Sequence, residues 1–107
     1  MKRGTICWVN LEPTSPPEFG KTCPAVIISN SVQNMVLQTV VVLPLSTQPP
    51  EIWPLRLTLG LPKRKKSYVV MPGIRQVAKT RLLDVIGFCS MKDMERITGA
   101  LEAYLQD

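Results

Sequence analysis

Ala25-Val26-Ile27-Ile28-Ser29 is a continuous apolar run, and it predicts a strand that is buried on both faces. A second run of this kind covers residues 39–45, where Pro44 indicates a strand end or a sheet edge because proline has no N–H for a ladder hydrogen bond. A chain of 107 residues has room for one core of this kind. We therefore expect a single domain over residues 1–107.

Further short strands are predicted on both sides of these two runs, at residues 5–9, 55–59, 67–71, 74–77 and 84–88. The segment at 55–59 alternates leucine with polar residues, which is typical of a half-exposed antiparallel strand. Pro72-Gly73 separates the strand at 67–71 from the one at 74–77. The pattern predicts six to seven short antiparallel strands that form a barrel or sandwich.

The C-terminal segment has the spacing of a helix. Ser90 is a suitable N-cap, and Asp93 follows it at the position of a capping box. The predicted apolar face consists of Met94, Ile97, Leu101, Tyr104 and Leu105. The fold class is therefore mainly β with one terminal helix, which we expect to cover an open face of the barrel.

Composition restricts the classes of function. The net charge of +5 favours polyanionic partners such as nucleic acid. The chain has no histidine and three widely spaced cysteines, so it offers no evident zinc site, and we expect neither a metal nor another cofactor. No apolar run approaches the roughly 20 residues that span a bilayer, and no signal core follows Met1, so we expect a cytoplasmic protein.

The order of several motifs along the chain resembles the PemK/MazF toxin family. Residues 3–14 (RGTICWVNLEPT) and 18–29 (EFGKTCPAVIIS) resemble its first two sequence blocks, and the proline-rich loop between them is irregular. Residues 68–77 (YVVMPGIRQV) resemble the strand that reads DQIRTV in the family, and residues 79–82 (KTRL) resemble its DKxRL turn. The resemblance extends over essentially the whole chain.

This resemblance implies an SH3-like β-barrel of the CcdB/PemK type and the toxin role in a type II toxin–antitoxin system. Such toxins are homodimers that cleave single-stranded RNA, including mRNA, without a metal and leave 2′,3′-cyclic phosphate ends. The expected partners are RNA and a cognate antitoxin with an acidic, partly disordered tail. Operator DNA is expected only through the antitoxin complex.

The resemblance also implies where the catalytic residues lie. The family places an arginine just before the Pro-Ala-Val strand, where its guanidinium grips a phosphate, but this chain has Cys23 there. Ser46 matches a hydroxyl that hydrogen-bonds to the same phosphate. Arg75 is expected to line the groove, although it is also read as a structural arginine that pairs with Glu12 or Asp84.

Five further residues are expected to contact RNA. Glu18 lies where the family keeps a glutamate, and its role is either to contact a base edge or to hold the loop shape. The full set is Glu18, Lys21, Thr22, Thr47 and Gln76. Trp53 and Phe19 are read either as base-stacking platforms or as core or interface residues. The basic turn at residues 63–66 is read either as solvated or as steering RNA.

Cys23 admits three interpretations. The first is an attenuated or inactive site. The second is that Lys21 supplies the missing charge, since two residues apart in an extended segment share a face. The third is a reactive thiol whose pKa is lowered by a cation.

The functional hypotheses are accordingly an endoribonuclease toxin and a catalytically inactive module that binds antitoxin or nucleic acid. A gyrase poison on the same fold is disfavoured, since the chain does not end in a Trp-Gly-Ile-like sequence.

Overall fold

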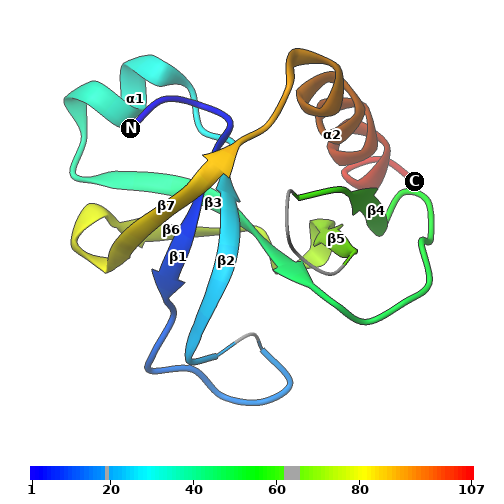
Figure 1. Ribbon diagram of the computed structural model, residues 1–107, viewed down its shortest axis with the longest axis horizontal. Coiled ribbons are helices and arrows are strands. Elements are labelled where there is room, and N and C mark those ends of the chain that lie inside the picture. The colour runs from blue at the N-terminus through cyan, green and yellow to red at the C-terminus, as the bar shows by residue number, and fades with distance from the viewer. Residues whose placement is uncertain (19, 62–65) are drawn as a thin grey trace.

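The computed structural model describes residues 1–18, 20–61 and 66–107, and it shows a mainly antiparallel β structure with a C-terminal helix (Figure 1). The elements are β1 (Thr5–Asn10), β2 (Thr22–Ile27), α1 (Ser31–Val36), β3 (Thr39–Ser46), β4 (Arg56–Leu59), β5 (Ser67–Val70), η1 (Met71–Gly73), β6 (Arg75–Ala78), η2 (Lys79–Arg81), β7 (Leu82–Phe88) and α2 (Met91–Tyr104). The predicted fold class is confirmed. No helix in the described ranges is long and apolar enough to cross a membrane.

Strand β3 lies at the centre of the sheet, whose order is β4-β5-β3-β2-β1-β7. Both β5 and β6 pair with β3, β5 at residues 45–46 and β6 at residues 39–42. The turn η1 joins them, so β5 and β6 form one interrupted strand along the same edge of β3. Pro72 lies in η1, where its missing N–H costs no ladder hydrogen bond. The predicted break at Pro72-Gly73 is confirmed.

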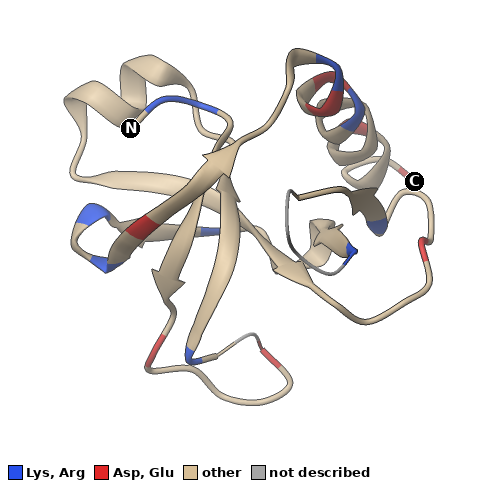
Figure 2. Ribbon diagram, in the orientation of Figure 1, with Lys and Arg blue, Asp and Glu red and all other residues tan. Residues whose placement is uncertain are grey.

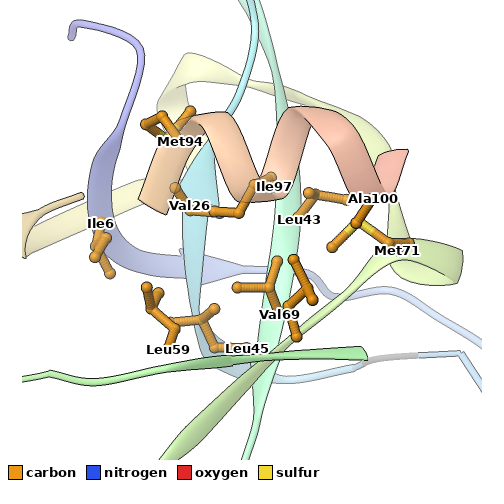
Figure 3. Close-up of a cluster of buried hydrophobic side chains, with 11 residues drawn as sticks. Ile6, Val26, Leu43, Leu45, Leu59, Val69, Met71, Met94, Ile97 and Ala100 are labelled. Atoms are coloured by element: carbon orange, nitrogen blue, oxygen red, sulfur yellow. The ribbon is translucent and has the colours of Figure 1, made fainter. Parts of the chain in front are cut away.

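One hydrophobic core lies between the sheet and α2 (Figure 3). Met94, Ile97 and Ala100 of the helix are buried there against side chains of β2, β3 and β5. Ser90 caps the helix, since its Oγ accepts the Asp93 N–H at 3.1 Å. The prediction that Leu105 belongs to the apolar face is wrong. Leu105 is 69% exposed because it is the C-cap residue and lies beyond the last helical turn.

A second core occupies the opposite face of the sheet. Because successive strand residues point to opposite faces, Val9, Ala25, Ile27 and Val42 form this core while their neighbours contact the helix side. The prediction of a strand buried on both faces is confirmed for Ala25, Val26 and Ile27. The strand begins earlier than predicted, at Thr22, because residues 22–24 pair with β1.

Candidate functional site

Cys23 and Arg75 lie near each other on the sheet face that α2 does not cover. Arg75 pairs with Val42, and Val42 pairs with Ile27, so Arg75 projects from the same face as Ile27 and Cys23. Burial raises the pKa of the Cys23 thiol to about 11, and the positive charge of Arg75 lowers it to a smaller extent. Arg75 is half-buried, and its Nη1 donates to the Leu11 carbonyl at 3.4 Å. The thiol is therefore neutral near pH 7.

Ser46 is the last residue of β3, and alternation along the strand sets it on the same face as Val42. The ladder between β2 and β3 ends at the pair Ala25–Pro44, and Ser46 pairs instead with Tyr68 of β5, so the sheet does not pair Ser46 with Cys23. The Ser46 Oγ accepts the backbone N–H of Gln48 at 3.1 Å. Among the described residues the Ser46 hydroxyl donates no hydrogen bond of its own, so its proton is available to a ligand.

A pocket of about 470 Å³ lies between the long β1–β2 loop and η1. Arg75 contributes its positive charge and Glu18 its carboxylate. The other lining residues are mostly apolar or small: Pro13, Thr14, Pro17, Val70, Pro72, Gly73 and Ile74. Of the predicted site residues, Arg75 and Glu18 therefore line the pocket, while Cys23 and Ser46 do not.

The β1–β2 loop holds its own shape through polar contacts. The Glu18 carboxylate accepts the Ser15 N–H at 3.0 Å. Lys21 closes the loop, since its N–H donates to the Glu12 carboxylate and its carbonyl accepts the Leu11 N–H at 2.8 Å. The expectation that Lys21 shares a face with Cys23 is wrong in its premise. Lys21 has a φ of 57°, so the segment is not extended there.

The remaining predicted RNA contacts lie apart from the pocket. Thr22 and Thr47 are exposed beside Cys23 and Ser46. Gln76 follows Arg75 in β6 and so projects from the opposite face, where its amide donates to the Thr39 hydroxyl at 2.9 Å. The structure thus sets Arg75 near Cys23 and places Arg75 and Glu18 in one pocket, with Ser46 on the same face at the end of β3, and it places Gln76 on the opposite face.

Two arginines near the site have roles that sequence reasoning missed. The Arg81 Nη1 donates to the carbonyl of Asn10 at 3.1 Å and also to the carbonyl of Glu12, and so holds the start of the loop. The Arg56 Nη1 donates to the Gln48 carbonyl at 2.8 Å. Figure 2 shows the Lys and Arg positions in blue along the ribbon. The alternating segment at 55–59 marked Arg56 as outward-facing, but no sequence pattern pointed to either carbonyl contact.

Some aromatic and basic residues can be placed and others cannot. Trp53 is 59% exposed, so it is not a core residue. Phe19 and residues 63–65 lie outside the described residues. Within the described ranges, no three His, Cys, Asp or Glu side chains gather in a way that could hold a metal ion.

Comparisons with known proteins identify relatives over nearly the whole chain. Residues 2–105 match the family described as PemK-like, MazF-like toxin of type II toxin–antitoxin system. The curated Endoribonuclease MazF9 of Mycobacterium tuberculosis is 29% identical, and the match covers 98% of this chain and 96% of that protein.

Solved structures of similar proteins share the fold. An endoribonuclease in complex with its cognate antitoxin, from a mycobacterial species, has a TM-score of 0.82 and 26% identity, with 98% of this chain and 94% of that chain covered. MazF from Deinococcus radiodurans has a TM-score of 0.83 at 20% identity, with 98% and 96% covered. The family match over residues 2–105 and the seven-stranded fold agree, and the chain belongs to the PemK/MazF family of type II toxin–antitoxin endoribonucleases.

Proposed function

We propose that this protein is the toxin of its pair, a metal-independent endoribonuclease that cleaves single-stranded RNA, including mRNA, and leaves 2′,3′-cyclic phosphate ends. One observation carries the proposal: Arg75 lies near Cys23 on one sheet face and, together with Glu18, lines a loop pocket of about 470 Å³. A pocket with a guanidinium, a carboxylate and mostly apolar walls, on the sheet face that also carries Ser46, suits an RNA backbone with unstacked bases.

Each side chain has a distinct role in the proposed reaction. Cleavage requires that the 2′-hydroxyl lose a proton as its oxygen attacks phosphorus, that the phosphorane be stabilised, and that the 5′-oxygen gain a proton as its bond to phosphorus breaks. Arg75 balances the negative charge of the phosphorane, and Ser46 donates its free proton to a phosphate oxygen. Glu18 is the one carboxylate among the described pocket-lining residues, so we assign proton acceptance or a base-edge contact to it.

With Cys23 the site stabilises a phosphate less well than a site with a cation at that position. A thiol with a pKa of about 11 carries no charge near pH 7 and donates only weakly. Loss of one such electrostatic group costs on the order of 10²–10³ in rate. The raised pKa argues against a reactive thiol, and the left-handed backbone of Lys21 removes the reason to expect its ammonium beside Cys23.

The proposed partners follow from charge and from the relatives. A mycobacterial endoribonuclease of the same fold was solved in complex with its cognate antitoxin. We propose that an antitoxin with an acidic tail occupies the same groove here, because the chain carries a net charge of +5. We also propose a homodimer in the cytoplasm that meets operator DNA only through the antitoxin.

RNA cleavage in EDTA tests the proposal. The wild-type protein is incubated with a long single-stranded RNA beside the Ser46→Ala and Cys23→Arg variants. We expect slow cutting by the wild type, loss of cutting in Ser46→Ala, and faster cutting in Cys23→Arg. Failure of all three to cut or bind RNA contradicts the proposal.

The second candidate is a catalytically inactive module that binds antitoxin or nucleic acid. The neutral thiol at position 23 is the observation that favours it. If the wild type binds RNA without cutting it and only Cys23→Arg cuts, this second candidate is correct.

A further inference from the structure

The turn that carries Ser46 is held by Arg56 of β4. Gln48 connects the two residues, since its N–H donates to Ser46 Oγ at 3.1 Å and its carbonyl accepts from Arg56 Nη1 at 2.8 Å. Two hydrogen bonds, both to the backbone of Gln48, therefore connect the Arg56 guanidinium with the Ser46 hydroxyl.

Arg56 also projects from the face of the candidate site. It alternates along β4 with Leu57, which is buried in the core beneath α2, just as Ser46 alternates along β3 with Leu45 of the same core. Both polar residues therefore point away from the helix. Across the sheet Arg56 pairs with Val70, which lines the pocket. Arg56 does not itself line the pocket, but it lies directly across the ladder from a residue that does.

The charge of Arg56 has no acidic partner among the described residues. Glu51 is near in sequence, but its carboxylate accepts the Thr58 N–H at 2.9 Å and pairs with Arg96 at 3.6 Å. These contacts lower the pKa of Glu51, the Thr58 hydrogen bond most. A guanidinium has five N–H donors, and in the described ranges Arg56 uses one nitrogen, on the Gln48 carbonyl. The other donors are available to an anion.

We propose that Arg56 binds an RNA phosphate together with Ser46, and so supplies at the Ser46 turn the positive charge that Cys23 does not provide. The inference rests on the proposed function, since the anion is the RNA backbone. A planar guanidinium matches two phosphate oxygens in parallel, and the Ser46 proton is directed to the same group. The RNA backbone then passes between Arg75 and Arg56.

Salt-dependent binding tests this role separately from folding. The probe is a fluorescent single-stranded oligoribonucleotide of mixed sequence with 2′-O-methyl groups, which cannot be cleaved by attack of the 2′-oxygen. Its affinity is measured over a series of NaCl concentrations for the wild type and for Arg56→Gln, Arg56→Lys and Arg96→Gln. The control, Arg96→Gln, removes the same charge from an arginine that also donates to a β4 carbonyl, that of Thr58 at 3.3 Å.

Arg56→Gln is expected to lower the affinity about tenfold at low salt and to reduce the slope of log K against log salt by about 0.7, the contribution of one phosphate contact on a single strand. Arg56→Lys keeps the charge and is expected to keep the slope. Equal slopes for Arg56→Gln and Arg96→Gln overturn the inference, as does a reduced slope for Arg56→Lys. If the wild type does not bind the probe at all, the proposed function fails and this inference fails with it.

Discussion

The Glu12 carboxylate accepts the backbone N–H of Lys21 and thereby joins the two ends of the β1–β2 loop. Gly20 lies directly beside this contact. A Cβ at position 20 would come within 2.5 Å of Thr14 Oγ1 and 3.0 Å of Glu12 Oε1. A side chain at position 20 therefore requires the Thr14 and Glu12 side chains to shift, in the loop that forms one wall of the pocket.

Gly20→Ala is expected to displace the loop. We expect a loss of about 1–3 kcal/mol in the free energy of unfolding, measured by urea denaturation, because the packed site must rearrange. We also expect weaker RNA binding. Gly60→Ala is the matched control, since a Cβ there meets nothing within 4 Å, and it should change stability by no more than about 0.5 kcal/mol. Equal effects of the two variants contradict the prediction.

Arg81→Ala is expected to open the start of the loop, because it removes the hydrogen bonds to the carbonyls of Asn10 and Glu12. Trypsin cleavage after Lys21 should become about tenfold faster under native conditions. The comparison is Arg3→Ala, which loses bonds to Ile28 O at 3.1 Å and Thr98 Oγ1 at 2.7 Å, away from the loop. If both variants are cut after Lys21 at the same rate, Arg81 does not hold the loop.

Cys23 is expected to react slowly with iodoacetamide at neutral pH. Because burial raises its pKa to about 11, the thiolate fraction, and with it the rate, should rise about tenfold per pH unit between pH 7 and 10. Cys89, whose pKa is also raised to about 11, should follow the same profile, which peptide mass spectrometry can record. A rate at Cys23 that levels off near pH 8 would show a lowered pKa instead.

Folding stability has a pH dependence from the same two thiols. Their pKa values are raised on folding from an ordinary 9.0, so their contribution to stability is fully present below pH 9. It is lost as the pH rises through 11. Thermal unfolding of the Cys23→Ser and Cys89→Ser variants should accordingly show less destabilisation between pH 9 and 11 than the wild type.

Gly99→Ala is expected to stabilise the protein by about 0.5–1 kcal/mol. Gly99 lies inside α2, where glycine is costly, and a Cβ there meets nothing within 4 Å. Thermal unfolding measures the gain. A loss of stability instead would mean that another chain packs against α2 at Gly99.

The sequence predicted those parts of the structure that depend on local pattern. Apolar runs located β2 and β3, Pro72-Gly73 located the break between β5 and β6, and Ser90 located the start of α2. Residues whose role depends on distant backbone were not predictable in this way. Arg81 contacts the carbonyl of Asn10, 71 residues earlier, and such a contact leaves no periodicity in the sequence.

The candidate site shows the same division. Resemblance located Cys23, Ser46 and Arg75, and register in the sheet brings them to one face. The expectation for Lys21 assumed an extended backbone, and that premise is wrong because Lys21 has a left-handed φ of 57°. Alternation along a strand predicts the direction of a side chain, but only for residues that lie within the strand.

The two cores lie on opposite faces of β2 and β3, one beneath α2 and the other continuous with the site. A substitution that shortens a buried side chain beneath α2 lowers the free energy of unfolding and leaves the face that carries Cys23 and Arg75 as it is. In the second core a fully buried residue such as Ala25 or Ile27 is equally costly to replace, whereas the half-buried Cys23 lies at the edge of that core. A substitution at position 23 can therefore change the charge of this face while both cores stay in place.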